Sequence, residues 1–120
     1  RVDVDRLAGE LLAAYDHAVQ LRPAFVEAQR RRAEVLAELG RFDDAASALD
    51  QVIAAGGPGQ TGAEVFLARG LARAKAGQLT AAVDDYTQAL ALRPEAAAHN
   101  QRGWLYVALR ASKLALADFD

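Results

Sequence analysis

The residues best able to do chemistry are a glycine-rich turn, two histidines and two pairs of neighbouring aspartates. The turn, GPGQTG at 57–62, satisfies the dinucleotide fingerprint G-x-G-x-x-G. That fingerprint requires a strand before the glycines, whereas an alanine-rich helical segment precedes this turn. Ala63 and Glu64 also stand where a phosphate-binding loop requires Lys and Ser or Thr. We therefore interpret 57–62 as a loop between helices, and we expect no cofactor.

Neither histidine has a catalytic partner that the sequence can identify. No hydroxyl nucleophile is placed beside His17 or His99 on a predicted helical face, and no trio of His and carboxylate has metal-ligand spacing. His17 falls on a helix flank. The sequence therefore predicts no catalytic residue, no metal site and no enzyme activity.

The aspartate pairs Asp43/Asp44 and Asp84/Asp85 suggest acid–base chemistry or a divalent cation. However, adjacent helical residues diverge by about 100°, so the two carboxylates of a pair do not converge on one ligand. Asp43 and Asp44 belong to a predicted first turn, where the helix dipole favours negative charge. We interpret these acids as parts of solvated helix faces.

Composition favours an all-α protein of 120 residues with alanine abundant, three prolines and 52% hydrophobic residues. The net charge of −2 is too balanced to favour a nucleic-acid partner. No apolar run approaches the roughly 18 residues needed to span a bilayer. The absence of cysteine suits a cytoplasmic protein. The first residue is Arg1, which leaves a removed signal peptide or an upstream domain open.

A unit that pairs two helices recurs along the chain. RAEVLAELGRFDDAASALDQVI from Arg32 superposes without gaps on RGLARAKAGQLTAAVDDYTQAL from Arg69, and RGWLYVALRASKLALADFD from Arg102 follows them. Two sets of aligned positions hold only small residues, which are Ala33, Gly70 and Gly103, and then Ala45, Ala82 and Ala115. Between these two sets lie Gly40, Gly77 and Arg110, and after them come the bulky Leu49, Tyr86 and Phe119. Small residues therefore face large ones in register.

Gly77 is the predicted boundary between the two helices of its unit. Only a residue without Cβ enters the left-handed region cheaply, so this glycine ends the first helix and a second begins near Thr80.

These positions resemble the tetratricopeptide repeat, a helix pair of about 34 residues. The full unit is 63–96, with Phe66, Gly70, Ala82, Tyr86, Ala89 and Pro94 at the family's positions. Gln29 replaces an aromatic residue in the degenerate unit 26–59. The helix 5–22 is expected to be the second helix of an earlier unit, and 96–120 a partial third unit that stops within its second helix. The resemblance implies one segment, 1–120, that forms a right-handed α-solenoid truncated at both ends.

The resemblance also implies a concave groove lined by first helices. Three sets of residues point into it: Glu27, Arg30, Arg31, Glu34 and Glu38; Glu64, Leu67, Ala68, Leu71 and Lys75; and Ala97, Asn100, Gln101, Trp104 and Ala108. We call these sets the first, second and third ribs. Spacings of three and four independently place each rib on one helix face.

Several rib residues have two interpretations. The pairs Glu27–Arg31 and Arg30–Glu34 either solvate their own helix, at about 0.2–0.5 kcal/mol each, or bind a partner. Trp104 either anchors a ligand beside Leu71 or packs on a further unit, while Leu105 and Tyr106 supply core contacts. His99, at the family's aromatic position, is expected to be tucked between helices.

We therefore expect a non-catalytic scaffold that binds a peptide or partner helix in its groove. Chaperone-type members of this family grip a terminal carboxylate with Lys and Asn, but Ala68 and Leu71 stand where polar residues are needed. The alternative is a regulatory or assembly segment of a larger bacterial signalling enzyme, since the third unit resembles repeats appended to bacterial serine/threonine kinases. Self-association through exposed solenoid ends is a further expectation.

Overall fold

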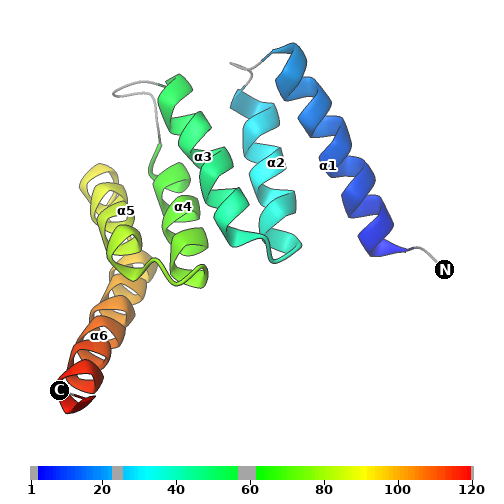
Figure 1. The fold of residues 1–120 in the computed structure, drawn as a ribbon. Coiled ribbons are helices and arrows are strands. Elements are labelled where there is room, and N and C mark those ends of the chain that lie inside the picture. The colour runs from blue at the N-terminus through cyan, green and yellow to red at the C-terminus, as the bar shows by residue number, and fades with distance from the viewer. Residues whose placement is uncertain (1–2, 23–25, 57–61, 120) are drawn as a thin grey trace. The chain divides into compact units, whose positions relative to one another are not determined.

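The structure is a computed structural model that describes residues 3–22, 26–56 and 62–119, with side chains up to Arg110. The helices in these residues are α1 (Val4–Leu21), α2 (Val26–Glu38), α3 (Phe42–Gly56), α4 (Ala63–Lys75), α5 (Leu79–Leu92) and α6 (Ala96–Phe119) (Figure 1). No strand occurs within the described ranges. The predicted all-α class is therefore confirmed. None of the described helices is long and apolar enough to cross a membrane.

The chain divides into two compact units, Arg1–Thr61 and Gly62–Asp120, which we call unit 1 and unit 2. The glycine-rich turn of the sequence falls at their junction and lies almost wholly outside the described residues. In unit 1, α2 packs against both α1 and α3, and in unit 2, α5 packs against both α4 and α6.

Unit 1 begins with a capped helix. The Asp3 side chain accepts a hydrogen bond of 3.1 Å from the backbone N–H of Arg6, so it caps α1. An ion pair between Asp16 of α1 and Arg32 of α2 joins these two helices. Leu36 of α2 is fully buried, and the other buried residues of unit 1 include Ala33, Ala45, Ala48, Leu49 and Val52.

The same glycine turn ends the first helix in both complete helix pairs. Gly77 has a φ of 86°, and the N–H of Gln78 donates to the carbonyl of Arg73 at 2.8 Å. Gly40 has a φ of 78°, and the N–H of Arg41 donates to the carbonyl of Leu36 at 2.9 Å. Each turn is a Schellman motif, in which glycine adopts the left-handed conformation. The predicted stop at Gly77 is confirmed, and α5 starts at Leu79, one residue before the predicted Thr80.

The core of unit 2 packs small residues against one buried ring. Tyr86, only 1% exposed, packs with Ala82, Ala98 and Leu105. A Cβ built on Gly70 would lie 3.3 Å from Cε2 of Tyr86 and 3.2 Å from Cβ of Asp85. Glycine therefore allows α4 to approach α5 closely, as the repeat pattern predicts.

The third repeat, 96–120, differs from its prediction because α6 is a single helix of 24 residues. The second helix expected around Ala115 does not start separately. Arg110 stands where Gly40 and Gly77 end their helices, and arginine is a good helix former with no easy access to the left-handed region. The predicted contacts of the Ala115 and Phe119 side chains lie outside the described side chains.

Two further expectations for α6 are wrong for the same reason. His99 is exposed, and Tyr106 is 52% exposed, whereas Leu105 is only 8% exposed. Ala98 and Leu105 share the face of α6 that packs against α5. Their neighbours His99 and Tyr106 lie about 100° farther around the helix, on a face that no other helix of the described residues in unit 2 covers.

Candidate functional site

The three predicted ribs lie on accessible helix faces. Every rib side chain is exposed or partly exposed, including Trp104 at 68% and Leu71 at 45%. The ribs belong to α2, α4 and α6 respectively.

A hollow lies between α4 and α6 within unit 2. Its volume is about 330 Å³, and its lining consists of Glu64, Leu67, Ala68, Leu71, Glu95, Ala97, Ala98 and Gln101. Most of these residues belong to the second and third ribs, so the structure brings the two ribs together. The rib pattern missed Glu95, which precedes α6, and Ala98, which faces the core. Lys75, Asn100 and Trp104 do not line the hollow.

Small side chains create the hollow. Both α4 and α6 pack against α5, and the surfaces they turn toward each other carry Ala68, Ala97 and Ala98. Leu67 packs against the core cluster of unit 2, and Leu71 is exposed at 45%. The hollow therefore has an apolar lining that larger side chains would fill.

The charged residues of the hollow are acidic. Glu64 lies in the first turn of α4 and Glu95 directly precedes α6. Because α4 and α6 both run antiparallel to α5, these two acids lie toward the same end. Glu95 forms an exposed ion pair of 3.4 Å with Arg93, which does not itself line the hollow. Among the described residues the lining contains no Lys, Arg or His, and a Lys/Asn clamp for a carboxylate is therefore not built here.

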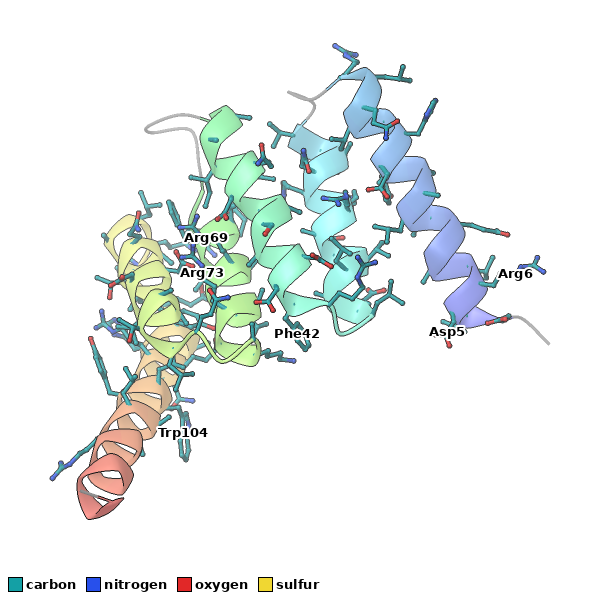
Figure 2. All side chains as sticks on the ribbon, in the orientation of Figure 1. Asp5, Arg6, Phe42, Arg69, Arg73 and Trp104 are labelled. Carbon is teal, nitrogen blue, oxygen red and sulfur yellow. The ribbon has the colours of Figure 1, made fainter. Side chains whose placement is uncertain are left out.

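Trp104 lies on the same side of α6 as the hollow but one turn beyond it. Gln101 and Trp104 are three residues apart, so they belong to one helical stripe. Figure 2 shows Trp104 projecting from α6. The indole is available to a ligand that extends beyond the hollow, although the structure does not place it against Leu71.

The first rib is charge-paired along α2. The Arg31 guanidinium donates to Glu27 at 3.0 Å and to Glu34 at 3.2 Å. The hydrogen bond and the charge of Glu34, followed by those of Glu27, raise the pKa of Arg31. The predicted Glu27–Arg31 pair is confirmed, but Glu34 pairs with Arg31 rather than with Arg30. A single guanidinium reaches both acids because they lie four residues before it and three after it.

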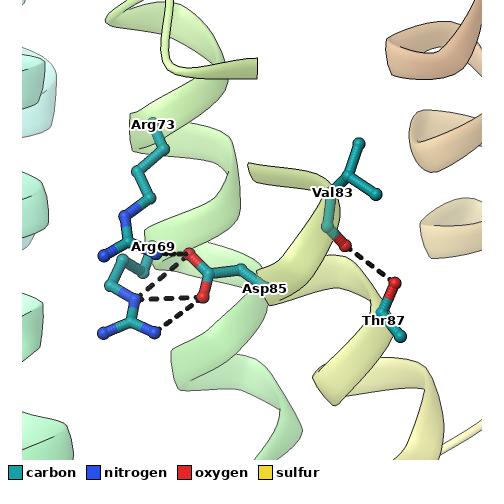
Figure 3. Close-up of polar contacts among 5 residues, drawn as sticks. All are labelled: Arg69, Arg73, Val83, Asp85 and Thr87. Carbon is teal, nitrogen blue, oxygen red and sulfur yellow. Dashed lines mark hydrogen bonds and ion pairs between the residues drawn. The ribbon is translucent and has the colours of Figure 1, made fainter. Parts of the chain in front are cut away.

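A buried ionic cluster joins α4 to α5 (Figure 3). Asp85 is completely buried and accepts hydrogen bonds from Arg69 Nη2 at 2.7 Å and Arg73 Nη1 at 2.9 Å. The prediction of a solvated face is thus wrong for Asp85, whereas Asp43, Asp44 and Asp84 are exposed. The cluster helps to hold α4, one wall of the hollow, on α5.

The spacing of buried residues along α5 could have identified Asp85 as a buried position. The buried residues of α5 are Ala82, Asp85, Tyr86 and Ala89, which follow the three-and-four spacing of one helix face. Arg69 and Arg73 are four residues apart on α4, so both can reach one carboxylate. Asp84 and Asp85 differ in burial because consecutive helical positions point in different directions.

The comparisons with known proteins agree with this architecture. A family model described as Tetratricopeptide repeat matches residues 10–61 and 67–120. A search of curated protein sequences returned no significant match.

Solved structures with similar folds come from several proteins. MamA 41-end from Desulfovibrio magneticus RS-1 is 26% identical, with a TM-score of 0.76, over 93% of this chain and 62% of that one. The first TPR domain of human RPAP3 is 23% identical, with a TM-score of 0.75, over 88% of this chain and 82% of that one. The first TPR of Spaghetti (RPAP3) bound to the HSP90 peptide SRMEEVD is 23% identical, with a TM-score of 0.77 and the same two coverages.

These likenesses confirm the predicted fold class of tetratricopeptide-like helix pairs. The chain spans less than two thirds of the MamA chain from Desulfovibrio magneticus RS-1.

Proposed function

The chain belongs to the tetratricopeptide repeat family, and from this premise we propose that it is a non-catalytic protein-interaction module. Its binding site is the hollow between α4 and α6, which accepts side chains of a peptide or of a partner helix. The observation that carries this proposal is the apolar hollow of about 330 Å³, lined mainly by two of the predicted ribs. The structure of a domain with this fold bound to a peptide supports the ligand class.

The size and lining of the hollow fit part of a peptide. Ligand pockets usually range from about 300 to 1,000 Å³, so this hollow lies at the small end of that range. Ala68, Ala97 and Ala98 leave the space, while Leu67 and Leu71 offer apolar contact. We expect one or two apolar side chains to enter, with Trp104 contacting the adjoining part of the ligand. Trp is enriched among the residues that dominate binding energy.

The binding surface is held by α5 before a ligand arrives. The core around Tyr86 and the ionic cluster at Asp85 fix the packing of unit 2. Rigid helices limit the conformational entropy that is lost on binding, which favours affinity. Glu64 and Glu95 disfavour acidic peptides such as SRMEEVD, which is bound by the related domain.

The first rib, on α2, is a second surface that the sequence predicts for ligand binding. The charged pairs of the first rib could also bind a partner, but Arg31 already binds Glu27 and Glu34. The alternative role, as a regulatory or assembly segment of a larger signalling enzyme such as a kinase, gains no support from the family match or the structures compared. The interaction module is therefore the function that we propose.

Peptide selection tests this proposal and does not require the natural partner. Peptides selected from a random library displayed on phage for binding to the full chain should lose affinity for Ala68→Leu, because leucine fills the hollow. They should also bind Trp104→Ala more weakly. Ala91→Leu is the matched control, since Ala91 is exposed on α5 and does not line the hollow.

The affinities should be measured by fluorescence anisotropy after circular dichroism has confirmed that all variants fold. We expect Ala68→Leu to weaken binding by about tenfold or more, corresponding to about 1.4 kcal/mol, while Ala91→Leu binds normally. Failure to select any specific peptide, or equal binding by all variants, would reject the proposed function.

A further inference from the structure

The α6 helix presents three distinct faces. Ala98 and Leu105 pack in the core, whereas Ala97 and Gln101 line the hollow. The third face, which we call the open face of α6, consists of His99, Gly103, Tyr106 and Val107. Tyr106 is 52% exposed and Val107 is 60% exposed, and a Cβ built on Gly103 would meet nothing within 4 Å.

The same face is covered in α4. By the repeat superposition, Gly103 corresponds to Gly70, and the latter lies against the ring of Tyr86 in α5. Tyr106 corresponds to Arg73, which binds Asp85 of α5. The remaining equivalences are His99 with Phe66, which is 9% exposed, and Val107 with Ala74, which packs against the core cluster. The α4–α5 pair therefore shows the kind of helix that fits the open face of α6.

The α1 helix has the corresponding complementary face. Tyr15 and Ala18 superpose on Tyr86 and Ala89 of α5, which places Leu11 opposite Ala82 and Ala14 opposite Asp85 in the alignment. The open face of α1 consists of Leu7, Leu11 and Ala14, with Tyr15 at its edge. Leu7 is 47% exposed and Leu11 is 46% exposed, while Ala14 is also exposed.

We infer that α6 of one molecule pairs with α1 of a second copy and thereby forms an intermolecular helix pair like α4–α5. The Tyr15 ring of the second copy packs over Gly103, as Tyr86 packs over Gly70. Leu7 and Leu11 then bury apolar surface against the face that carries Tyr106 and Val107. This interaction uses a different face of α6 from the hollow, so it is independent of the proposed peptide site.

The two contacting surfaces differ, and the interface is therefore heterologous. Each molecule offers one α6 face and one α1 face, so every added molecule leaves a further surface available. Such contacts build rings or open chains rather than a single two-fold dimer. The inferred partner is consequently another copy of this chain, added head to tail.

Sedimentation velocity over a concentration series tests the association. The mean mass should rise with concentration, and Gly103→Leu should weaken association because it fills the notch for Tyr15. Leu11→Lys should also weaken it by about tenfold or more, since it removes an apolar contact. Gly9→Leu is the control: Gly9 is an open glycine of α1 on a different face.

Cysteine cross-linking distinguishes the proposed contact from other forms of self-association. The chain has no natural cysteine, so Tyr15→Cys and Gly103→Cys can be made as separate proteins. In an oxidised mixture, the mixed disulfide dimer should form much faster than the disulfide homodimer that either protein forms alone. The pair His17→Cys and Gly103→Cys should not do so, because His17 lies on another side of α1.

A monomer at every concentration would overturn the inference. Association that Gly103→Leu and Leu11→Lys leave unchanged would overturn it too, as would equal cross-linking of the test and control cysteine pairs. Weakened association with a preferential mixed disulfide would support it. Circular dichroism and thermal unfolding separate these effects from loss of the fold.

Discussion

At the scale of single residues, Asp85 is a buried charge whose two partners both come from α4. Its carboxylate is completely buried and binds two guanidinium groups, which are themselves only 13% and 21% exposed for Arg69 and Arg73. Burial of a charge is costly unless partners compensate it. The cluster therefore supports the packing of α4 on α5 only while both signs of charge are present.

Asp85→Asn should destabilise the fold by about 3 kcal/mol, because it leaves two largely buried guanidinium groups without their carboxylate. Asp84→Asn is the matched control on the exposed side of α5, and it should change stability by no more than about 0.5 kcal/mol. Urea unfolding measures both values. Equal effects at the two positions would contradict the assigned role of Asp85.

Gly70 and Gly103 occupy aligned positions but differ in their surroundings. Gly70→Ala should destabilise the chain by about 1 kcal/mol, because Asp85 and the buried Tyr86 cannot easily withdraw from the new methyl group. Gly103→Ala should stabilise an isolated molecule by about 0.5–1 kcal/mol through higher helix propensity. Thermal unfolding at low protein concentration tests the opposite signs, and stabilisation by both substitutions would refute the close-packing argument.

Ionisation of the Tyr86 hydroxyl should lower the stability of the fold at alkaline pH. Burial, and secondarily the charge of Asp85, raises the pKa of Tyr86 above its usual 10.0. Above pH 10 the unfolded chain releases this proton more readily than the folded chain, so the free energy of unfolding falls as pH rises through the folded pKa. Tyr86→Phe should flatten this fall in urea unfolding curves between about pH 9 and 11. Parallel pH curves for Tyr86→Phe and the unmodified chain would exclude the mechanism.

At the scale of helices, the sequence predicts where the first helix of each complete pair ends because the turn has a local cause. Glycine allows the positive φ values at positions 40 and 77, and the backbone N–H groups satisfy the terminal carbonyls. The third repeat, 96–120, was harder to predict, because aligning it with the other repeats places a turn at Arg110. Local backbone chemistry instead favours continuation of α6.

Gly77→Ala should destabilise the chain by about 1–2 kcal/mol, because an alanine side chain disfavours the left-handed conformation. Gly9→Ala provides the contrasting substitution inside α1, where the glycine has no positive φ and alanine has a higher helix propensity. Chemical denaturation should separate their effects. Stabilisation by Gly77→Ala would contradict the role of this turn.

The burial of side chains on α5 also shows why residue type alone was insufficient. Asp84 and Asp85 have the same side chain, but only Asp85 falls on the stripe that includes Ala82, Tyr86 and Ala89. Its charge partners come from α4, which makes the final pairing a property of tertiary packing. Sequence phase could identify the buried position, whereas the structure was needed to identify both arginine partners.

At the scale of the whole molecule, the repeated pattern predicts the family and most helices, but the sequence does not identify a ligand. Leu67, Ala68 and Leu71 were predicted on one face of α4, and Ala97 and Gln101 on one face of α6. The structure adds the hollow between them and the contributions of Glu95 and Ala98. Helix spacing could not predict this volume because it depends on how both helices pack against α5.

The most direct test of the interaction-module account is a nuclear magnetic resonance titration of the isotopically labelled chain with its best selected peptide. Resonances of Leu67, Ala68, Leu71, Ala97 and Gln101 should respond most strongly and saturate together, with weaker changes in unit 1. Ala68→Leu should abolish this pattern without unfolding the protein. A saturable response centred on residues outside the α4–α6 hollow, with no change there, would contradict the central claim.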